Sequence, residues 1–435
     1  MGQWIMQGLS LRKNVSWTFT GNVIYAGGQM LVFVIMAKLL DPERVGMYVL
    51  GLAITTPVFI LSNFGLRQVL ATDARANKPF KHYFTLRLLM TFGALILCGA
   101  IILLGGYRGA TAAVIGAIAL SKSVEAISDV FYGLFQQHER LDLMARSMII
   151  RSVLMVPAFV IGVYASGTAH WGIAGIVIAW FLVLALHDYF QGRKFLNESA
   201  RSEVVEEGGT KRSFITFDRP ALMSLARLAF PLAIATGLAS FQYQIPRYLI
   251  EQFLGVAMLG IYAGMAYPMF ALRTLVLALG QSAAPRLALL HAESKPVEFR
   301  RLLLKLVGIG LAGGIILILV VALAGRPIIL FLYKPEFAAH LGAFIWIAAA
   351  GAVSFIMSFA GYGITALRLF KIVPFLNTTA ILVMAGLCFW LIPIHGLVGA
   401  AWASLTADLV ILPAYAGIIW YGSKRPLKEE EYRGQ

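Results

Sequence analysis

The sequence alternates long apolar stretches with short, mostly basic loops along all of its 435 residues. Each stretch is long enough to cross a bilayer, because roughly 20 apolar residues in a helix span the hydrocarbon core. The pattern therefore predicts an all-α polytopic membrane protein with about 12 transmembrane helices. The predicted spans lie near residues 15–39, 46–72, 82–105, 110–136, 144–166, 171–192, 221–246, 254–288, 299–324, 341–366, 371–393 and 396–421.

Composition supports the membrane class, since 59% of the residues are hydrophobic and only 13% are charged. The net charge of +15 could indicate a nucleic-acid partner. Its basic residues, however, lie in loops between spans, where membrane topology places them. The two cysteines, Cys98 and Cys388, lie inside apolar stretches, and no Cys/His cluster has metal-ligand spacing. We expect no nucleic-acid partner, no metal and no cofactor.

The loops on the two sides of the predicted membrane differ strongly in basic charge. One set of alternate loops, with which we count Arg87, carries 25 Lys and Arg residues. The opposite set carries 6, namely Lys38, Arg44, Arg108, Arg247, Arg326 and Lys334. Because cytoplasmic loops are enriched in Lys and Arg, both termini are predicted to be cytoplasmic.

Three short patterns recur in the same order in the two halves of the chain. Leu40-x5-Gly46 matches Leu254-x5-Gly260, Gly133-x6-Arg140 matches Gly361-x6-Arg368, and Gly172-x-x-Gly175 matches Gly396-x-x-Gly399, at offsets of 214, 228 and 224. Since each half holds an even number of spans, the repeats share one orientation. This arrangement predicts two parallel six-helix repeats around a central cavity, as in transporters.

The repeats and the polar central loop suggest a division into four parts. We predict an N-terminal six-helix bundle over 1–192, a cytoplasmic linker over 193–218, a C-terminal six-helix bundle over 219–423 and a cytoplasmic tail over 424–435. The linker is assigned because its stretch NESARSEVVEEGGTKRS is polar and charged.

Charged residues inside the predicted spans are the first candidates for function, because each costs roughly 2.5–3.5 kcal/mol at the bilayer centre. Lys122, Glu125 and Asp129 fall at i, i+3 and i+7, hence on one helical face. They form either a structural or gating ion pair or part of a transport path. Asp408 is a further membrane acid. Glu125, Asp129 and Asp408 are therefore candidates for ion coupling or gating.

Arg67, Arg151 and Arg273 have no acid within a helical turn. Their partners must come from another helix or from a ligand. We favour a cation-lined cavity for an anionic substrate, to which Lys122 could contribute; interhelical pairing or snorkelling of the long side chains is the alternative.

A polar stripe marks the first predicted span and recurs in the seventh. Thr18, Asn22, Tyr25 and Gln29 share one helical face, and Thr236, Ser240, Tyr243 and Arg247 repeat the spacing. At the offset of 214, Asn22 corresponds to Thr236 and Gln29 to Tyr243. We expect Asn22, Gln29, Thr236, Tyr243 and Arg247 to contact a substrate headgroup. The alternative is hydrogen bonding between helices, worth about 0.6 kcal/mol for each bond.

These residues resemble a family. Residues 14–54 (NVSWTFTGNVIYAGGQMLVFVIMAKLLDPERVGMYVLGLAI), the Asn63–Leu66 segment (NFGL) and the Phe253–Gly255 segment (FLG) are similar to polysaccharide-biosynthesis flippases. These are Wzx-type O-antigen and exopolysaccharide repeat-unit translocases of the multidrug/oligosaccharidyl-lipid/polysaccharide exporter superfamily. Many relatives carry an Asp immediately before the arginine that ends the seventh span, whereas here the pair is Pro246-Arg247. A coupling role for that acid is not carried over.

The resemblance implies two six-helix bundles around a V-shaped, cation-rich cavity in a bacterial inner membrane. It implies export of undecaprenyl-diphosphate-linked oligosaccharide from the cytoplasmic to the periplasmic leaflet by alternating access. The expected partners are this lipid-linked oligosaccharide, membrane lipids, and the polysaccharide polymerase and chain-length machinery. The sugar composition of the cargo is left open.

Two other functions remain as alternatives. A multidrug antiporter of the same superfamily would use a membrane acid on the first or seventh span for cationic substrates, and the first span has none. A membrane polysaccharide polymerase or ligase would need a large external loop or a carboxylate constellation at the interface. We therefore expect a transporter and not an enzyme.

Overall fold

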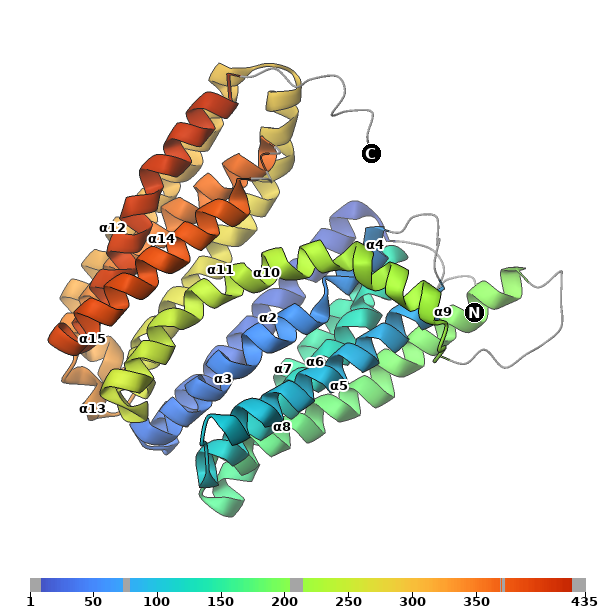
Figure 1. Ribbon diagram of the computed structural model, residues 1–435, viewed down its shortest axis with the longest axis horizontal. Coiled ribbons are helices and arrows are strands. Elements are labelled where there is room, and N and C mark those ends of the chain that lie inside the picture. The colour runs from blue at the N-terminus through green and yellow to red at the C-terminus, as the bar shows by residue number, and fades with distance from the viewer. Residues whose placement is uncertain (1–8, 73–78, 204–213, 368, 370–371, 425–435) are drawn as a thin grey trace. The chain divides into compact units, whose positions relative to one another are not determined.

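The computed structural model describes residues 9–72, 79–203, 214–367, 369 and 372–424, and every regular element within them is helical (Figure 1). The helices of the first half are α2 (Leu11–Leu39), α3 (Pro42–Asn63), α4 (Leu66–Thr72), α5 (Phe80–Leu104), α6 (Gly109–Gln137), α7 (Leu141–Ser166), α8 (Ala169–Val183), the π-helix η1 (Leu184–Asp188) and α9 (Tyr189–Glu203). The second half contains α10 (Arg219–Leu254), α11 (Val256–Ala292), α12 (Pro296–Leu332), α13 (Pro335–Ala338), α14 (Leu341–Ala366) and α15 (Val373–Gly422).

The helices confirm the predicted all-α membrane fold. Among the described residues, ten helical segments are long and apolar enough to cross a membrane. The long helix α10 lies outside those ten, and Gly396, at φ 58° and ψ −135°, breaks α15 into two parts. The arrangement agrees with the predicted count of about 12 spans.

The chain divides into two compact units. The first contains residues 1–40 and 47–240, and the second contains residues 41–46 and 241–435. The division falls within α10, whereas the predicted boundaries stand at 192/193 and 218/219. Helix α9 also extends to Glu203, through the start of the predicted linker. The predicted domain boundaries stay predictions.

Contacts explain why residues 214–240 belong to the first unit. Phe214 packs against Phe80, Phe84 and Phe131, with ring centroids 5.7–6.5 Å apart. The backbone N–H of Thr216 donates to the Thr85 hydroxyl at 2.9 Å. Aromatic packing of this kind adds about 0.5–1.5 kcal/mol for each pair. The segment that precedes α10 is therefore anchored to α5 and α6.

Each unit buries its own apolar core and leaves further apolar side chains outside. In the second unit α14 packs against α11, α12 and α15, and Phe299, Leu303 and Phe359 lie in the core. Leu104 is 89% exposed and Leu323 is 85% exposed. Large exposed apolar surfaces mark membrane or protein contacts, so these side chains are placed to face lipid.

Glycines of the recurring patterns lie where two backbones meet. Within the second unit, a Cβ on Gly46 would lie 1.8 Å from the Val256 carbonyl oxygen, and one on Gly260 would lie 2.1 Å from the Pro42 carbonyl oxygen. The first turns of α3 and α11 therefore touch backbone to backbone. Only glycine permits this approach.

A second pair of patterns has the same role. A Cβ on Gly175 would lie 2.4 Å from the Ala158 carbonyl oxygen, and one on Gly399 would lie 2.1 Å from that of Leu391. The glycines of the third pair of patterns differ in their surroundings. A Cβ on Gly133 would lie 3.3 Å from the Arg67 backbone, whereas a Cβ on Gly361 would meet nothing within 4 Å. In two of the three patterns, therefore, the glycines of both halves lie where a Cβ would collide with a neighbouring backbone.

The Gly260→Ala variant tests the close contact between α3 and α11. We expect it to destabilise the protein by about 1–3 kcal/mol, because a methyl group cannot fit against a carbonyl without moving the backbone. The matched control is Gly308→Ala, since a Cβ there meets nothing within 4 Å. Thermal unfolding in detergent, followed by size-exclusion chromatography, measures the difference. Equal melting temperatures would contradict the contact.

Candidate functional site

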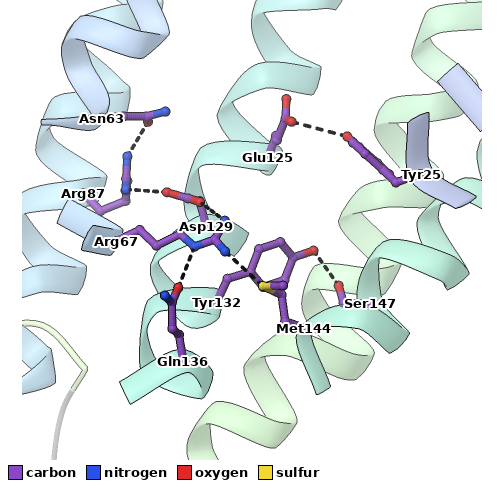
Figure 2. A network of polar contacts seen from close by, with 10 residues as sticks. All are labelled: Tyr25, Asn63, Arg67, Arg87, Glu125, Asp129, Tyr132, Gln136, Met144 and Ser147. Atoms are coloured by element: carbon purple, nitrogen blue, oxygen red, sulfur yellow. Dashed lines mark hydrogen bonds and ion pairs between the residues drawn. The ribbon is translucent and has the colours of Figure 1, made fainter. Parts of the chain in front are cut away.

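A network of charged side chains lies inside the first unit, and Arg87 is its most buried member (Figure 2). Its side chain is 0% exposed; it donates to Asp129 at 3.0 Å and to the Asn63 carbonyl oxygen. The prediction that Arg87 belongs to a basic loop is wrong, because α5 begins at Phe80 and encloses Arg87. The membrane acid Asp129 was the available signal, since a buried carboxylate requires a cation.

Arg67 shares Asp129 with Arg87. Its guanidinium lies 3.4 Å from the Asp129 carboxylate and donates through Nε to Gln136 at 3.3 Å. It also lies 5.9 Å from the Tyr132 ring centroid (Figure 2). The sequence leaves Arg67 either in a cation-lined cavity or in an ion pair between helices. The structure shows the ion pair, and 31% of the Arg67 side chain remains exposed.

Lys122 and Glu125 form a separate pair on α6. Their charged atoms lie 2.8 Å apart, and the Tyr25 hydroxyl donates to Glu125 at 3.3 Å. Gln29 lies within hydrogen-bonding reach of Tyr25. The polar stripe of α2 therefore reaches α6 through Tyr25, whereas Asn22 is exposed and donates to the Thr18 carbonyl of its own helix at 2.7 Å.

Arg151 is paired with Asp188, an acid that is not among the predicted site residues. The two side chains are 1% and 0% exposed, and their charged atoms lie 3.2 Å apart. Arg151 also donates to Ser128, and its guanidinium lies 5.7 Å from the Trp180 ring centroid. Asp188 ends the π-helix η1, and single π turns inside helices occur frequently at functional sites.

Cations exceed anions in this part of the first unit. Arg67, Arg87, Arg151 and Lys122 are cations, and Glu125, Asp129 and Asp188 are anions. With His187, which lies 3.0 Å from Asp188, counted as neutral, one positive charge is in excess among these described groups. The cluster is thus held together by ion pairs and remains slightly positive.

The second unit contains a pocket of about 120 Å³ between α10, α11, α14 and α15. The polar and charged side chains at its wall include Tyr243, Arg247, Arg273, Ser354, Ser404 and Asp408. Four of the predicted site residues are therefore brought together: Tyr243, Arg247, Arg273 and Asp408. Thr236 is not among the lining residues, and its hydroxyl donates to the Ala233 carbonyl at 3.2 Å.

Arg273 differs from the three arginines of the first unit in its partners. Its guanidinium donates to the Tyr243 hydroxyl and lies 4.4 Å from the Tyr243 ring centroid. Its Nε is buried and has no hydrogen-bond partner. Within the described part of the chain, neither Arg273 nor Asp408 forms an ion pair. The pocket therefore holds a guanidinium with unused donor capacity.

Arg247 contributes a second cation to the wall. It donates to Gln244 at 2.9 Å and lies 5.3 Å from the Phe270 ring centroid. Two guanidinia beside hydroxyl groups suit an anion with hydroxyl or phosphate oxygens, because the planar fork of Arg matches such oxygens.

Two helical units with charged groups among apolar helices define a polytopic membrane protein of the transporter class. The chain matches the family described as polysaccharide biosynthesis protein over residues 11–291, and it belongs to that family. The resemblance stated from the sequence is thereby confirmed.

Known relatives agree with this assignment. The capsular polysaccharide biosynthesis protein CapF of Staphylococcus aureus is 26% identical over 407 residues, covering 93% of this chain and 98% of CapF. The fold is shared with the lipid II flippase MurJ in an inward closed conformation, at a TM-score of 0.68 and 12% identity over 92% of this chain and 87% of MurJ. It is also shared with an inward-facing multidrug resistance MATE family transporter of the MOP superfamily, at a TM-score of 0.63 and 12% identity over 97% and 98% of the two chains.

The pair of Arg151 and Asp188 can be tested as a structural element. Asp188→Asn should destabilise the protein by about 3–5 kcal/mol, because it leaves a buried guanidinium without a counter-charge. The double variant Arg151→Met with Asp188→Leu should recover most of this loss, since both charges are removed together. Thermal unfolding in detergent measures both effects. A single variant as stable as the unmodified protein would contradict the structural role.

Proposed function

We propose that the protein is a flippase that moves undecaprenyl-diphosphate-linked polysaccharide repeat units from the cytoplasmic to the periplasmic leaflet by alternating access. The membership of the polysaccharide biosynthesis family and the fold of membrane transporters and flippases support the coarser statement, a membrane polysaccharide transporter. The bacterial inner membrane as location, both termini in the cytoplasm, and the polysaccharide polymerase and chain-length machinery as partners belong to the same proposal.

The observation that carries the proposal is Arg273 in the pocket of the second unit. A guanidinium in an apolar helix bundle is costly unless an anion approaches it. Arg151 and Arg87 have such anions in Asp188 and Asp129. Arg273 lines the pocket of the second unit and forms no ion pair among the described residues. A phosphate of the lipid-linked substrate would accept hydrogen bonds from the unused donors of this guanidinium.

We assign the neighbouring residues by their exposure and contacts. Tyr243 and Arg247 line the pocket with Arg273 and would contact phosphate or sugar oxygens. Within the first unit, Arg67 and Lys122 are partly exposed, at 31% and 23%, and remain candidates for contacts with the anionic substrate. Asn22, Gln29 and Thr236 remain candidates for headgroup contacts. Arg151, at 1% exposure, we assign to holding the helices together.

Asp408 gives the alternative function its best support. A half-buried acid in the pocket could bind a cationic substrate or a coupling proton, as a multidrug antiporter requires. Glu125 and Asp129, the other candidates for ion coupling, are already engaged by Lys122 and by Arg67 and Arg87. Two arginines at the same pocket wall nevertheless make its charge positive, which favours an anionic substrate.

Deletion of the gene in its host tests the proposed function. We expect a complete repeat unit linked to undecaprenyl diphosphate to accumulate on the cytoplasmic leaflet, with loss of the surface polysaccharide. Mass spectrometry of inner-membrane lipid extracts, combined with an enzymatic test of leaflet accessibility, measures this. Normal lipid-linked pools with altered drug efflux would establish the antiporter instead. Repeat units already on the periplasmic face would establish a polymerase or ligase.

The Arg273→Gln variant tests the assigned anion site. We expect export to fall by about tenfold or more, because hydrogen bonds to charged groups contribute about 1.5–3 kcal/mol. The matched control is Arg286→Gln, an exposed arginine on the same helix α11, which should export normally. Complementation of the deletion strain, with protein levels equalised, measures both. Equal export by the two variants would remove Arg273 from the site.

A further inference from the structure

A cluster of basic residues lies at one end of the second unit, apart from the pocket of Arg273. Arg300, Arg301 and Lys305 lie on the first turns of α12, and Lys424 follows the end of α15. Together with Val297 and Leu304, the three α12 cations line an open groove of about 530 Å³. We refer to Arg300, Arg301, Lys305, Lys424 and Trp420 as the basic groove.

Trp420 joins the two helices of the basic groove. The Arg300 guanidinium lies 4.0 Å from the Trp420 ring centroid, and the Lys424 ammonium lies 4.6 Å from it. Arg300 also donates through Nε to the Ser423 hydroxyl at 2.8 Å. Two cations are thus held close to one indole ring, in the arrangement that cation–π attraction favours.

The cations of the basic groove form no ion pair within the described part of the chain. Glu298, three residues before Arg301 on α12, is a single acid among four cations, so positive charge stays in excess. Arg301 and Lys305 are four residues apart on one face of α12, and like charges at this spacing repel each other. The nearby Glu293 is engaged by Lys295 at 2.8 Å, and this hydrogen bond holds the pKa of Glu293 below its usual value. The groove therefore favours a negatively charged occupant.

Apolar side chains are exposed directly beside these cations. Leu304 is 68% exposed, Val297 is 66% exposed and Trp420 is 56% exposed. Phe299 and Leu303, on the opposite face of α12, are buried in the core of the unit. Basic residues, tryptophan and exposed aliphatic groups together are typical of the membrane–water interface, where headgroup and acyl chain meet.

We infer that the basic groove is a binding site for an anionic phospholipid of the cytoplasmic leaflet. The lipid phosphate would lie among Arg300, Arg301 and Lys305, and its acyl chains would lie along Val297 and Leu304. Basic pockets between transmembrane helices bind anionic headgroups in this way. The site is separate from the transported substrate, so lipid binding holds or fails independently of transport; only its assignment to the cytoplasmic leaflet rests on the topology given under the proposed function.

Native mass spectrometry of the full chain tests the site. The purified, delipidated protein is titrated with phosphatidylglycerol or with phosphatidylcholine of the same acyl chains. We expect selective binding of phosphatidylglycerol, and binding roughly 30-fold weaker in the double variant Arg301→Gln with Lys305→Gln, because both removed cations attract an anionic headgroup. The control Arg193→Gln with Lys194→Gln removes the same charge from two exposed residues of α9 and should bind normally.

A second probe locates the lipid on the protein. Phosphatidylglycerol with a spin label near its headgroup should quench Trp420, so the variant Trp420→Phe should lose that part of the quenching. Equal binding of the two lipids, or equal loss in the control variant, would overturn the inference. So would equal competition by inorganic phosphate, which would show a site for free anions. Selective binding that arises only after removal of residues 425–435 would overturn the inference, because the C-terminal tail would then be the occupant of the groove.

Discussion

The cost of removing a charge from water is the constraint on which the structure of the first unit depends. An ionised side chain in an apolar interior is tolerated only beside an opposite charge and hydrogen-bonding groups. Asp129 serves both Arg67 and Arg87, which joins α4 and α5 to α6. Arg151 and Asp188 join α7 to the π-helix η1 in the same manner. These pairs set the mutual register of helices whose remaining contacts are largely apolar and non-directional.

In the pocket of the second unit, a guanidinium lies without an ion-pair partner among the described residues, and this observation carries the proposed function. The pocket wall presents Arg247 and Arg273, while Asp408 remains outside any ion pair among the described residues. A bundle that neutralises its arginines in one unit and leaves a guanidinium with spare donors in the other is suited to an anionic ligand. The charge pattern thus separates groups that hold helices together from groups that are available to a substrate.

Backbone contacts at glycine explain why weak sequence patterns recur in the two halves. Gly46 and Gly260 permit α3 and α11 to touch at their first turns, and Gly175 and Gly399 permit close helix hairpins. Small residues are favoured where membrane helices cross, because helices surrounded by lipid associate through close van der Waals packing. The recurrence of these glycines therefore reflects packing geometry as well as the shared origin that the spacing suggests.

The sequence by itself determined the helical membrane class, the extents of most spans and the family, because these depend on local hydropathy and on short patterns. It also selected Arg273, Tyr243 and Asp408, which the fold brings to one pocket. Only the tertiary structure decided which charges neutralise each other. It placed Arg87 inside α5 and gave Arg151 a partner 37 positions along the chain. Pairing depends on which helix faces are neighbours, and neither spacing nor composition along one chain contains that information.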